Sequence, residues 1–184
     1  MTLPAPATRT EKDLLGEAEI PANAYYGIQT WRAQQNFDLS GVQLNHFPSL
    51  IQALAMVKQA AARANAQLGD LEQDRADAIE LACQQVIDGQ HHDQFVVDMI
   101  QGGAGTSTNM NANEVIANVA LEILGHGKGT YAALHQNNDV NMSQSTNDAY
   151  PTAVRLAILL SHGELVTALQ SLQQAFREKA VEFA

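Results

Sequence analysis

Apolar residues recur at helical spacing over four long stretches of the chain. The first runs from Pro48 to Gly69, and the second runs from Asp70 to about Asp88, just before Gly89. Spacings of three and four residues place apolar side chains on one face of a helix, and glycine commonly follows a helix end. Two helices are therefore predicted, with stripes at Leu50, Leu54, Val57, Ala61, Ala64 and Leu68, and at Ile79, Ala82, Cys83 and Val86.

The third and fourth stretches each follow a polar loop. The third ends at Gly125 and is expected to bury Val115, Ile116, Val119, Ala120 and Ile123. The fourth begins near Asn147 or Asp148, one of which is the expected cap, with Pro151 in the first turn. Its apolar spacing continues to Ala184, which predicts a helix of about 35 residues. A helix of that length needs partners along its length, so we expect the chain to stop inside a longer helix.

The first 32 residues lack such a pattern. Residues 1–10 are rich in Pro, Ala and Thr and are expected to be loose. Gly16, Pro21 and Gly27 interrupt the following stretch too often for a long helix, which favours short extended pieces. The prediction is a mainly α chain with a small β element near residues 14–30. We expect an N-terminal helical domain over residues 1–140 and the start of a second domain over residues 141–184.

The polar loop before the third helix contains candidate chemistry. Gly102, Gly103 and Gly105 allow a tight turn, and the run from Thr106 to Asn109 places small hydrogen-bonding groups at a helix start. Free backbone N–H groups and the positive end of the helix dipole make such a point suitable for an anion. The same residues also suit an ordinary capped core helix, so this stretch alone leaves both interpretations open.

A second loop repeats this arrangement. Residues 137–148 are almost all hydrogen-bonding side chains, include no Lys or Arg, and lead directly into the fourth helix. A loop of this composition can simply be solvated. Two clusters of Ser, Thr and Asn at helix starts nevertheless strengthen the anion-site interpretation until it stands level with capping alone.

Composition narrows the possible partners. The formal net charge is −10, which argues against nucleic acid or an anionic membrane but not against a small anion that is held locally. No apolar run reaches membrane length, and the N-terminus lacks a signal segment, so a cytoplasmic protein is expected. The single cysteine, Cys83, is interpreted as a buried apolar residue. His91 and His92 are adjacent without further ligands at suitable spacing, so no metal site is predicted.

Three blocks of the chain resemble the aspartase/fumarase superfamily, in the right order and over about residues 9–184. They are Asp13–Thr30, with Ala-Tyr-Tyr-Gly-Ile-Gln-Thr at its end, Val97–Glu114, with Gly-Gly-Ala-Gly-Thr-Ser-Thr-Asn-Met-Asn at its centre, and Gln144–Thr152, which reads Gln-Ser-Thr-Asn-Asp-Ala-Tyr-Pro-Thr. The resemblance implies the helical fold of that superfamily, with the last helix beginning a central bundle built by a homotetramer.

Within the superfamily the chain is most similar to the aspartase branch, which reversibly removes ammonia from L-aspartate to give fumarate without an organic cofactor. The resemblance implies that Thr106, Ser145, Thr146 and Asn147 hold the substrate's carboxylates and amino group. The family's base is a serine on a Gly-Ser-Ser-x-Met-Pro loop, and no part of this chain matches that loop. We therefore expect no catalytic residue within these 184 residues, and a chain that is inert on its own.

Two alternatives remain. Class II fumarate hydratases resemble the chain, but they usually carry Ser-Gly-Thr where Ala104–Thr106 stands and Ser-Ser-Asn where Ser145–Asn147 stands. His135 matches a histidine of the fumarases, although the proline that follows it there is Gln136 here. The second alternative is not an enzyme: it is a member of the superfamily that has lost catalysis and acts as a structural or binding protein.

Overall fold

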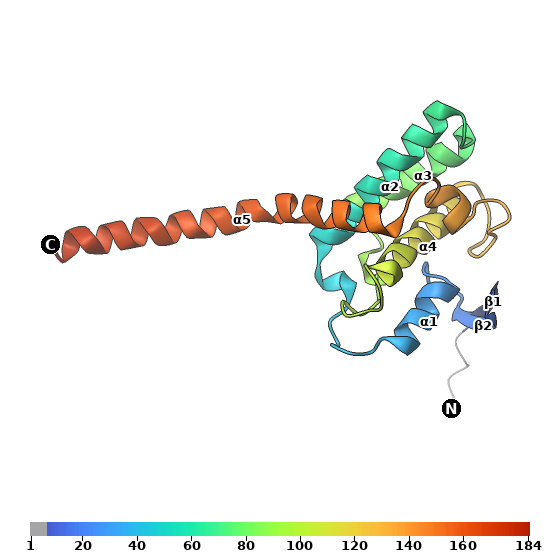
Figure 1. The fold of residues 1–184 in the computed structure, drawn as a ribbon, viewed down its shortest axis with the longest axis horizontal. Coiled ribbons are helices and arrows are strands. Elements are labelled where there is room, and N and C mark those ends of the chain that lie inside the picture. Colours follow the sequence, from blue (N-terminus) through green and yellow to red (C-terminus); the bar gives the residue numbers. More distant parts are fainter. Residues whose placement is uncertain (1–6) are drawn as a thin grey trace.

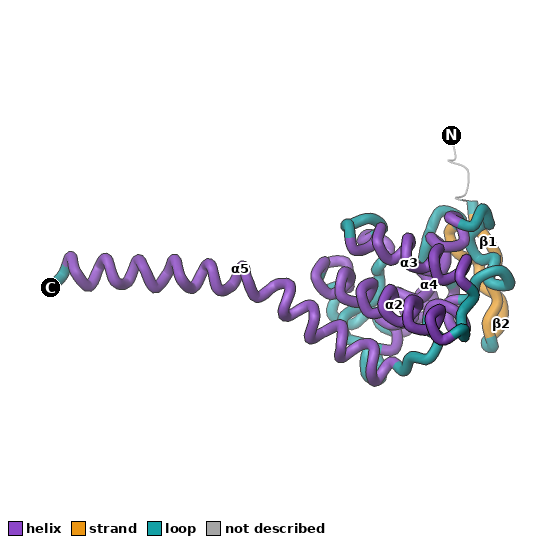
Figure 2. Tube along the Cα trace, turned by 90° about the horizontal axis from the view of Figure 1, so that it is seen from above, coloured by secondary structure: helices purple, strands orange, loops and turns teal. Residues whose placement is uncertain are grey.

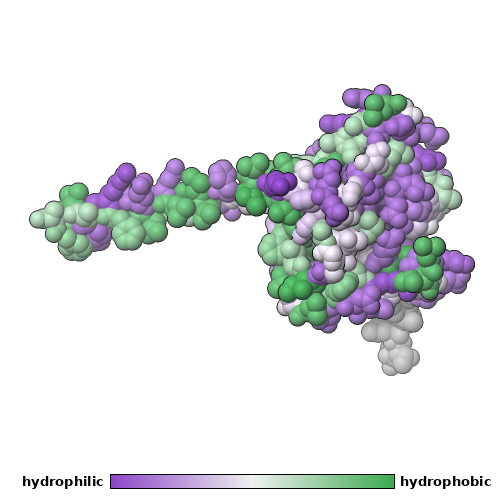
Figure 3. All heavy atoms as spheres, viewed as in Figure 1, coloured by the Kyte–Doolittle hydropathy of each residue, from purple (hydrophilic) through white to green (hydrophobic). Residues whose placement is uncertain are grey.

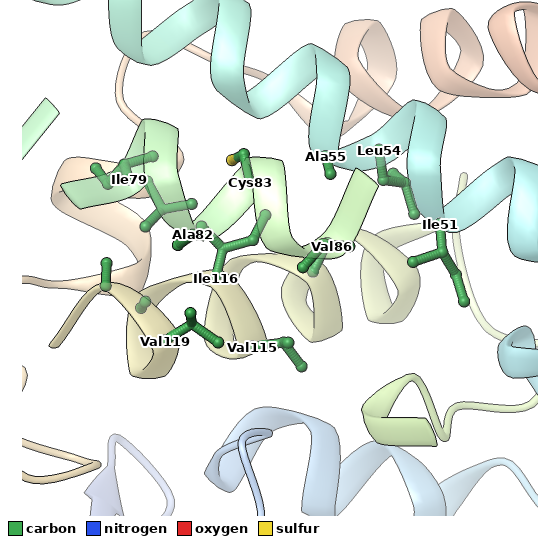
Figure 4. Close-up of a cluster of buried hydrophobic side chains, with 14 of the residues drawn as sticks. Ile51, Leu54, Ala55, Ile79, Ala82, Cys83, Val86, Val115, Ile116 and Val119 are labelled. Carbon is green, nitrogen blue, oxygen red and sulfur yellow. The ribbon is translucent and has the colours of Figure 1, made fainter. Parts of the chain in front are cut away.

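The apolar stripes of three helices meet in one core: α2 (Pro48–Leu68), α3 (Gln73–Ile87) and α4 (Thr106–Ile123). In this computed structural model, which describes residues 7–184, Ile79, Cys83 and Val86 of α3 lie between α2 and α4 (Figure 4). Cys83 is fully buried, as predicted, and burial raises the pKa of its thiol well above the usual range. The thiol is therefore a packing group rather than a nucleophile.

The β element lies earlier than predicted. Strands β1 (Thr8–Asp13) and β2 (Gly16–Pro21) form an antiparallel hairpin in which Thr8 faces Pro21 and Asp13 faces Gly16. The predicted small β element is thus confirmed, but it spans residues 8–21 rather than residues 14–30, and residues 8–10 are strand rather than loose chain. The rest of that predicted loose segment, residues 1–6, lies outside the described residues.

The sequence does not predict the bounds of the hairpin well, because polar contacts hold the hairpin together. The guanidinium of Arg9 donates to the carbonyl oxygens of Pro21 (3.0 Å), Ala24 (2.7 Å) and Tyr26 (2.7 Å) and pairs with Glu11. A strand that is anchored by an arginine shows little of the apolar alternation by which strands are recognised.

A buried carboxylate joins the N-terminal region to the core. Helix α1 (Ile28–Asn36) has no side-chain cap of its own. Glu114 of α4 instead accepts from the backbone N–H groups of Gly27 (2.9 Å), Gln29 (2.9 Å) and Thr30 (3.0 Å). Burial raises the pKa of Glu114 to about 7, while these hydrogen bonds act in the opposite direction. The carboxylate supplies the acceptors that the start of α1 lacks.

Most predicted helix boundaries are confirmed within a few residues. Helix α2 ends before Gly69 as expected, but α3 begins at Gln73 rather than Asp70. The shift arises because the backbone N–H groups of Asp70 and Leu71 both return to the carbonyl oxygen of Asn65 and close the end of α2. Helix α4 ends before Gly125, whose φ is +81°, but Ile123 is 37% exposed rather than buried.

Helix α5 (Thr146–Glu182) contains 37 residues and begins one to two residues earlier than predicted. Ser145 is its N-cap, in place of Asn147 or Asp148, because the Ser145 Oγ accepts from the Asn147 backbone N–H at 3.3 Å. Pro151 therefore lies in the second turn rather than the first, where it leaves the Asn147 carbonyl without a helical donor.

Only the first part of α5 packs on the rest of the chain. Ala149 and Ala153 are buried, whereas the helix beyond Ile158 projects into solvent (Figures 1 and 2). Figure 3 shows apolar residues along this projecting arm. The exposed large apolar residues there include Leu165, Leu169, Leu172 and Phe176, each more than half exposed.

By length and composition α5 is also able to cross a membrane, contrary to the expectation that no apolar run reaches membrane length. Helices that pack inside soluble proteins meet the same criterion, so this is weak evidence for a membrane span.

Short helical turns complete the fold: η1 (Leu44–His46), η2 (His92–Gln94) and the π-helical η3 (Gln136–Val140).

The start of α4 packs tightly against α5. Gly105 has φ +85°, and a methyl group added there would lie 2.5 Å from Cδ1 of Tyr150. The close approach of these two helix starts thus depends on glycine at position 105.

Replacing Gly105 by alanine is expected to lower the free energy of unfolding by about 2 kcal/mol more than the matched change Gly125→Ala. Both positions have a φ above +80°, but nothing lies within 4 Å of the site of a Gly125 methyl group. The difference between the variants therefore isolates the clash with Tyr150, and urea unfolding measures it. Equal destabilisation by both changes would contradict this packing.

Replacing Glu114 by glutamine is expected to lower the free energy of unfolding by about 2 kcal/mol at pH 8, where the carboxylate is ionised. In the wild type, backbone N–H groups donate to the Glu114 carboxylate. In the variant, the NH2 group of the glutamine would face one of these N–H groups, so that two donors would meet. Urea unfolding measures the effect, with Glu164→Gln on the exposed part of α5 as the control. An unfolding midpoint equal to that of the control would show that Glu114 does not hold α1.

Candidate functional site

The two polar loops that the sequence singled out come together at the starts of α4 and α5. Thr106 is the first residue of α4, Ser145 caps α5, and Thr146 and Asn147 open its first turn. Two hydrogen bonds join the loops directly, because the Asn109 Nδ2 donates to the Asn141 Oδ1 at 3.0 Å and to the Thr146 Oγ1 at 3.3 Å. Thr106, Ser145 and Asn147 are exposed and Thr146 is half-buried, so all four side chains lie where a ligand can reach them.

The first turns of the two helices run side by side in opposite directions. Gly105 meets Tyr150, and one turn further along α4 Asn109 meets Thr146, which is one turn before Tyr150 on α5. Because the turns overlap in an antiparallel manner, the two helix starts lie at opposite ends of the pair and their free backbone N–H groups point in opposite directions. The positive end of each helix dipole therefore favours an anion at its own end of the pair.

Gln101 fixes the glycine loop. Its Oε1 accepts from the Thr108 backbone N–H at 2.8 Å, and its Nε2 donates to the Thr108 Oγ1 at 2.7 Å and to the Asp98 carbonyl at 3.1 Å. One amide side chain therefore closes the loop at both ends. The intervening residues Gly102, Gly103 and Ala104 are left exposed as a projecting turn.

Asp98 anchors the base of this loop to a distant segment. Its carboxylate accepts from the Ile100 backbone N–H (2.7 Å) and from both the backbone N–H (2.8 Å) and the hydroxyl (2.7 Å) of Ser40. These hydrogen bonds hold the pKa of Asp98 far below its usual range. The carboxylate is therefore a permanent structural anion and is unsuited to act as a base at neutral pH.

A buried lysine lies under both loops. The Lys58 Nζ of α2 donates to the Oδ1 atoms of Asn109 and Asn141, each at 2.7 Å, and to the Oε1 of Gln144 at 2.9 Å. Its side chain is fully buried, and burial lowers its pKa to about 7. Three segments of the chain, α2, α4 and the loop before α5, thus meet at one amine.

Sequence reasoning missed Lys58, Asn109 and Glu114 as structural centres. A signal for Lys58 was present, because Leu54, Lys58 and Ala62 lie four residues apart and share one helical face. A charged residue in line with buried apolar positions points to a specific partner set. Nothing in the local sequence identifies that partner set, since it comes from residues 109–144.

His135 has a structural role in this fold. Its Nδ1 accepts from the backbone N–H groups of Asn137 (3.0 Å) and Asn138 (3.2 Å) and so caps η3. Among residues 7–184, no group of three or more His, Cys, Asp or Glu side chains is placed to hold a metal ion. The chemistry that the site offers is therefore that of neutral donors and helix starts, with one buried amine beneath them.

Comparison with known proteins finds relatives that share one name. The chain is 67% identical over 181 residues to an aspartate ammonia-lyase of Pseudomonas aeruginosa, covering 98% of this chain and 38% of that protein. It is 54% identical over 176 residues to an aspartate ammonia-lyase of Helicobacter pylori, again covering 38% of the relative. The chain thus spans little more than a third of the length of these curated relatives.

Solved structures show the same fold. A protein of Brucella melitensis described as a fumarate lyase:delta crystallin superposes with a TM-score of 0.92 at 61% identity, covering 96% of this chain and 41% of that one. A class II fumarase from Schistosoma mansoni gives a TM-score of 0.76 at 38% identity, covering 83% and 32%. The family model described as "Lyase" matches residues 16–184, and the chain therefore belongs to the lyase family.

Proposed function

We propose that this chain is part of an aspartate ammonia-lyase, which reversibly converts L-aspartate to fumarate and ammonia. Relatives of that name are 51–67% identical to it over nearly its whole length. Because the chain spans about 38% of those relatives, the activity is proposed for the whole protein rather than for these 184 residues alone.

The observation that carries the proposal is the pairing of the two helix starts through Asn109 and Thr146. From this pairing we infer that Thr106, Ser145, Thr146 and Asn147, which lie at the starts of the two helices, form one region of uncharged donors. A dicarboxylate needs several such donors at separate points, and the two helix dipoles favour its negative charge. We assign these four residues to the substrate's carboxylates and amino group.

In the proposed reaction, a base removes a proton from the carbon beside one carboxylate. That carboxylate then becomes a doubly charged aci-carboxylate, and ammonia leaves from the neighbouring carbon. Donors that are already in place stabilise the developing charge more than they stabilise the ground state, which accelerates the reaction. The base is expected from a serine outside these residues, and no organic cofactor takes part.

Class II fumarate hydratase is the competing activity, and the class II fumarase from Schistosoma mansoni is 38% identical to this chain. Ala104 and Thr146 stand where fumarases usually carry serine, and the aspartate ammonia-lyases are more similar overall. A relative that has lost catalysis remains the alternative outside enzymes. The exposed hydroxyls of Thr106 and Ser145 weigh against it.

The exposed apolar arm of α5 supports two further parts of the proposal. We place the start of a central bundle domain at residues 141–184, after an N-terminal domain over residues 1–140. Copies of the chain would cover the arm in a cytoplasmic homotetramer, because a long apolar surface is unfavourable in water.

Spectrophotometric assay of the whole protein tests the activity. L-aspartate is expected to give fumarate, L-malate is expected to give little or none, and the 184-residue chain alone is expected to be inactive. Predominant conversion of malate would favour the hydratase, and a whole protein inactive on both substrates would favour the non-catalytic relative.

Replacing Thr106 by valine in the whole protein is expected to lower kcat/KM for aspartate about 100-fold, because the change removes one donor to the developing charge. The matched control is Thr130→Val, at an exposed position in the turn after α4, which should behave as wild type. Steady-state kinetics provide the measurement, and a loss no greater than that of the control would remove Thr106 from the site.

A further inference from the structure

Lys58 is a buried charge without a countercharge. Its side chain is fully buried, and within residues 7–184 it forms no salt bridge. Its three partners are neutral amide oxygens of Asn109, Asn141 and Gln144. Buried ammonium groups are usually paired with a carboxylate, because removing the charge from water is costly. The missing partner therefore needs an explanation.

The geometry of the contacts is that of an ammonium. Three oxygen atoms lie 2.7, 2.7 and 2.9 Å from the Nζ, and a protonated amine has three N–H donors to meet them. A neutral amine has only two donors, so one oxygen would face its lone pair. The contacts favour the charged form against the effect of burial.

A donor-only group fixes the orientation of its partners. Because the Asn109 oxygen faces Lys58, its NH2 group must point the other way, where it donates to the Thr146 Oγ1 (3.3 Å) and the Asn141 Oδ1 (3.0 Å). The Asn141 and Gln144 NH2 groups likewise turn away and donate to carbonyl oxygens of the loop before α5.

The chain of donors ends at the predicted substrate site. The Thr146 Oγ1 accepts from Asn109, so its own O–H is left to donate elsewhere. Thr146 is half-buried between Ser145 and Asn147, whose side chains are exposed. Lys58, Asn109 and Thr146 thus form a row in which each group donates to the next, and such rows polarise every member in the same direction.

We propose that Lys58 is a positioning residue for the bound dicarboxylate: through Asn109 it turns the hydroxyl of Thr146 outward as a donor, and its positive charge is balanced by the dicarboxylate. This inference rests on the proposed function, since it assigns a role to the support of the same site.

Binding and the charge of Lys58 are then coupled. Burial lowers the pKa of Lys58 to about 7. The titratable group that faces it from α3 is the Cys83 thiol, which stays protonated and neutral because burial raises its pKa. Asn109 faces it from α4, and Asn141 and Gln144 face it from the loop before α5; all three are uncharged. A bound dianion favours the ammonium, so binding should take up a proton and weaken as the pH rises above 7.

The test uses fumarate, which stays fully ionised above pH 6, and the whole protein. Titration calorimetry from pH 6 to 9, in buffers of different ionisation enthalpy, gives the affinity and the proton uptake. The wild type is expected to bind with proton uptake near pH 7.5, and its affinity should fall by up to about tenfold per pH unit above the Lys58 pKa.

Two variants separate this role from a purely structural one. Asn109→Asp keeps an oxygen toward Lys58 but lacks the NH2 donor to Thr146, and it supplies a permanent countercharge. It should remain folded, bind fumarate at least about tenfold more weakly at pH 7, and lose the proton uptake. The Lys58→Met variant, in its folded form, should likewise bind fumarate without proton uptake.

The matched control is Asn111→Asp, the same change at a fully buried position on α4. The Asn111 side chain contacts the backbone of Gln94 and Val96 instead of Lys58. This variant should lose stability while keeping the wild-type proton uptake. Folding of each variant is followed by circular dichroism and its assembly by light scattering.

The outcomes distinguish this inference from the proposed function. A folded Asn109→Asp variant with wild-type affinity and proton uptake would overturn the role of Lys58 while leaving the lyase activity intact. A wild type that binds fumarate without proton uptake would overturn it as well. Failure of the wild type to deaminate aspartate would instead contradict the proposed function.

Discussion

Helix α4 is buried on almost every side, yet much of its surface is polar, and the arrangement of the remaining segments follows from that constraint. Asn109, Asn111, Asn113, Glu114 and Asn118 are all fully buried. A buried amide or carboxylate without partners is costly, so the neighbouring chain must bring donors and acceptors to meet these groups. Most of them reach backbone atoms rather than other side chains, which fixes the path of the chain around α4.

Four of these side chains each hold a different segment, whereas the Nδ2 of Asn113 reaches only the Met110 sulfur of α4 itself and its Oδ1 has no partner within the described residues. Asn118 donates to the Tyr25 carbonyl at 2.8 Å, and Glu114 takes the first backbone N–H groups of α1. Asn111 accepts from the Val96 N–H and donates to the Gln94 carbonyl, both at 3.0 Å. Asn109 connects Lys58 to Thr146. The three sequence blocks that carry the family resemblance are therefore neighbours in space, with α4 as their common support.

The helices could be read from the sequence because burying an apolar face is a property of one segment. The bounds of α2 and the end of α4 before Gly125 were predicted closely for that reason. The buried face of α2 was predicted less well, because Leu68 at the end of the expected stripe is 75% exposed, whereas Ala62 and Asn65 are buried. The β hairpin was misplaced because Arg9, rather than alternating apolar residues, secures it. The cap of α5 was misassigned because Ser, Thr, Asn and Asp stand in a row at 145–148 and each is a good cap.

The candidate site divides in the same way. Thr106 and Ser145–Asn147 are predicted site residues because the family resemblance assigns them, and small polar residues at a helix start form a local pattern that agrees with it. Lys58 was not found, because its role depends on three amides that lie 51, 83 and 86 residues further along the chain. Long-range polar contacts of this kind leave little trace in one sequence.

Helix α5 has two very different environments along one continuous backbone. Its first turns belong to the packed body, so their amide hydrogens should exchange only when that body opens. Beyond Ile158 the backbone has no tertiary support within the described chain and should exchange far sooner, as in an isolated helix. Any partner that covers the arm will slow amide hydrogen exchange there first. The exchange rates of the α5 amides therefore report on assembly, along the same helix that begins at the two polar loops.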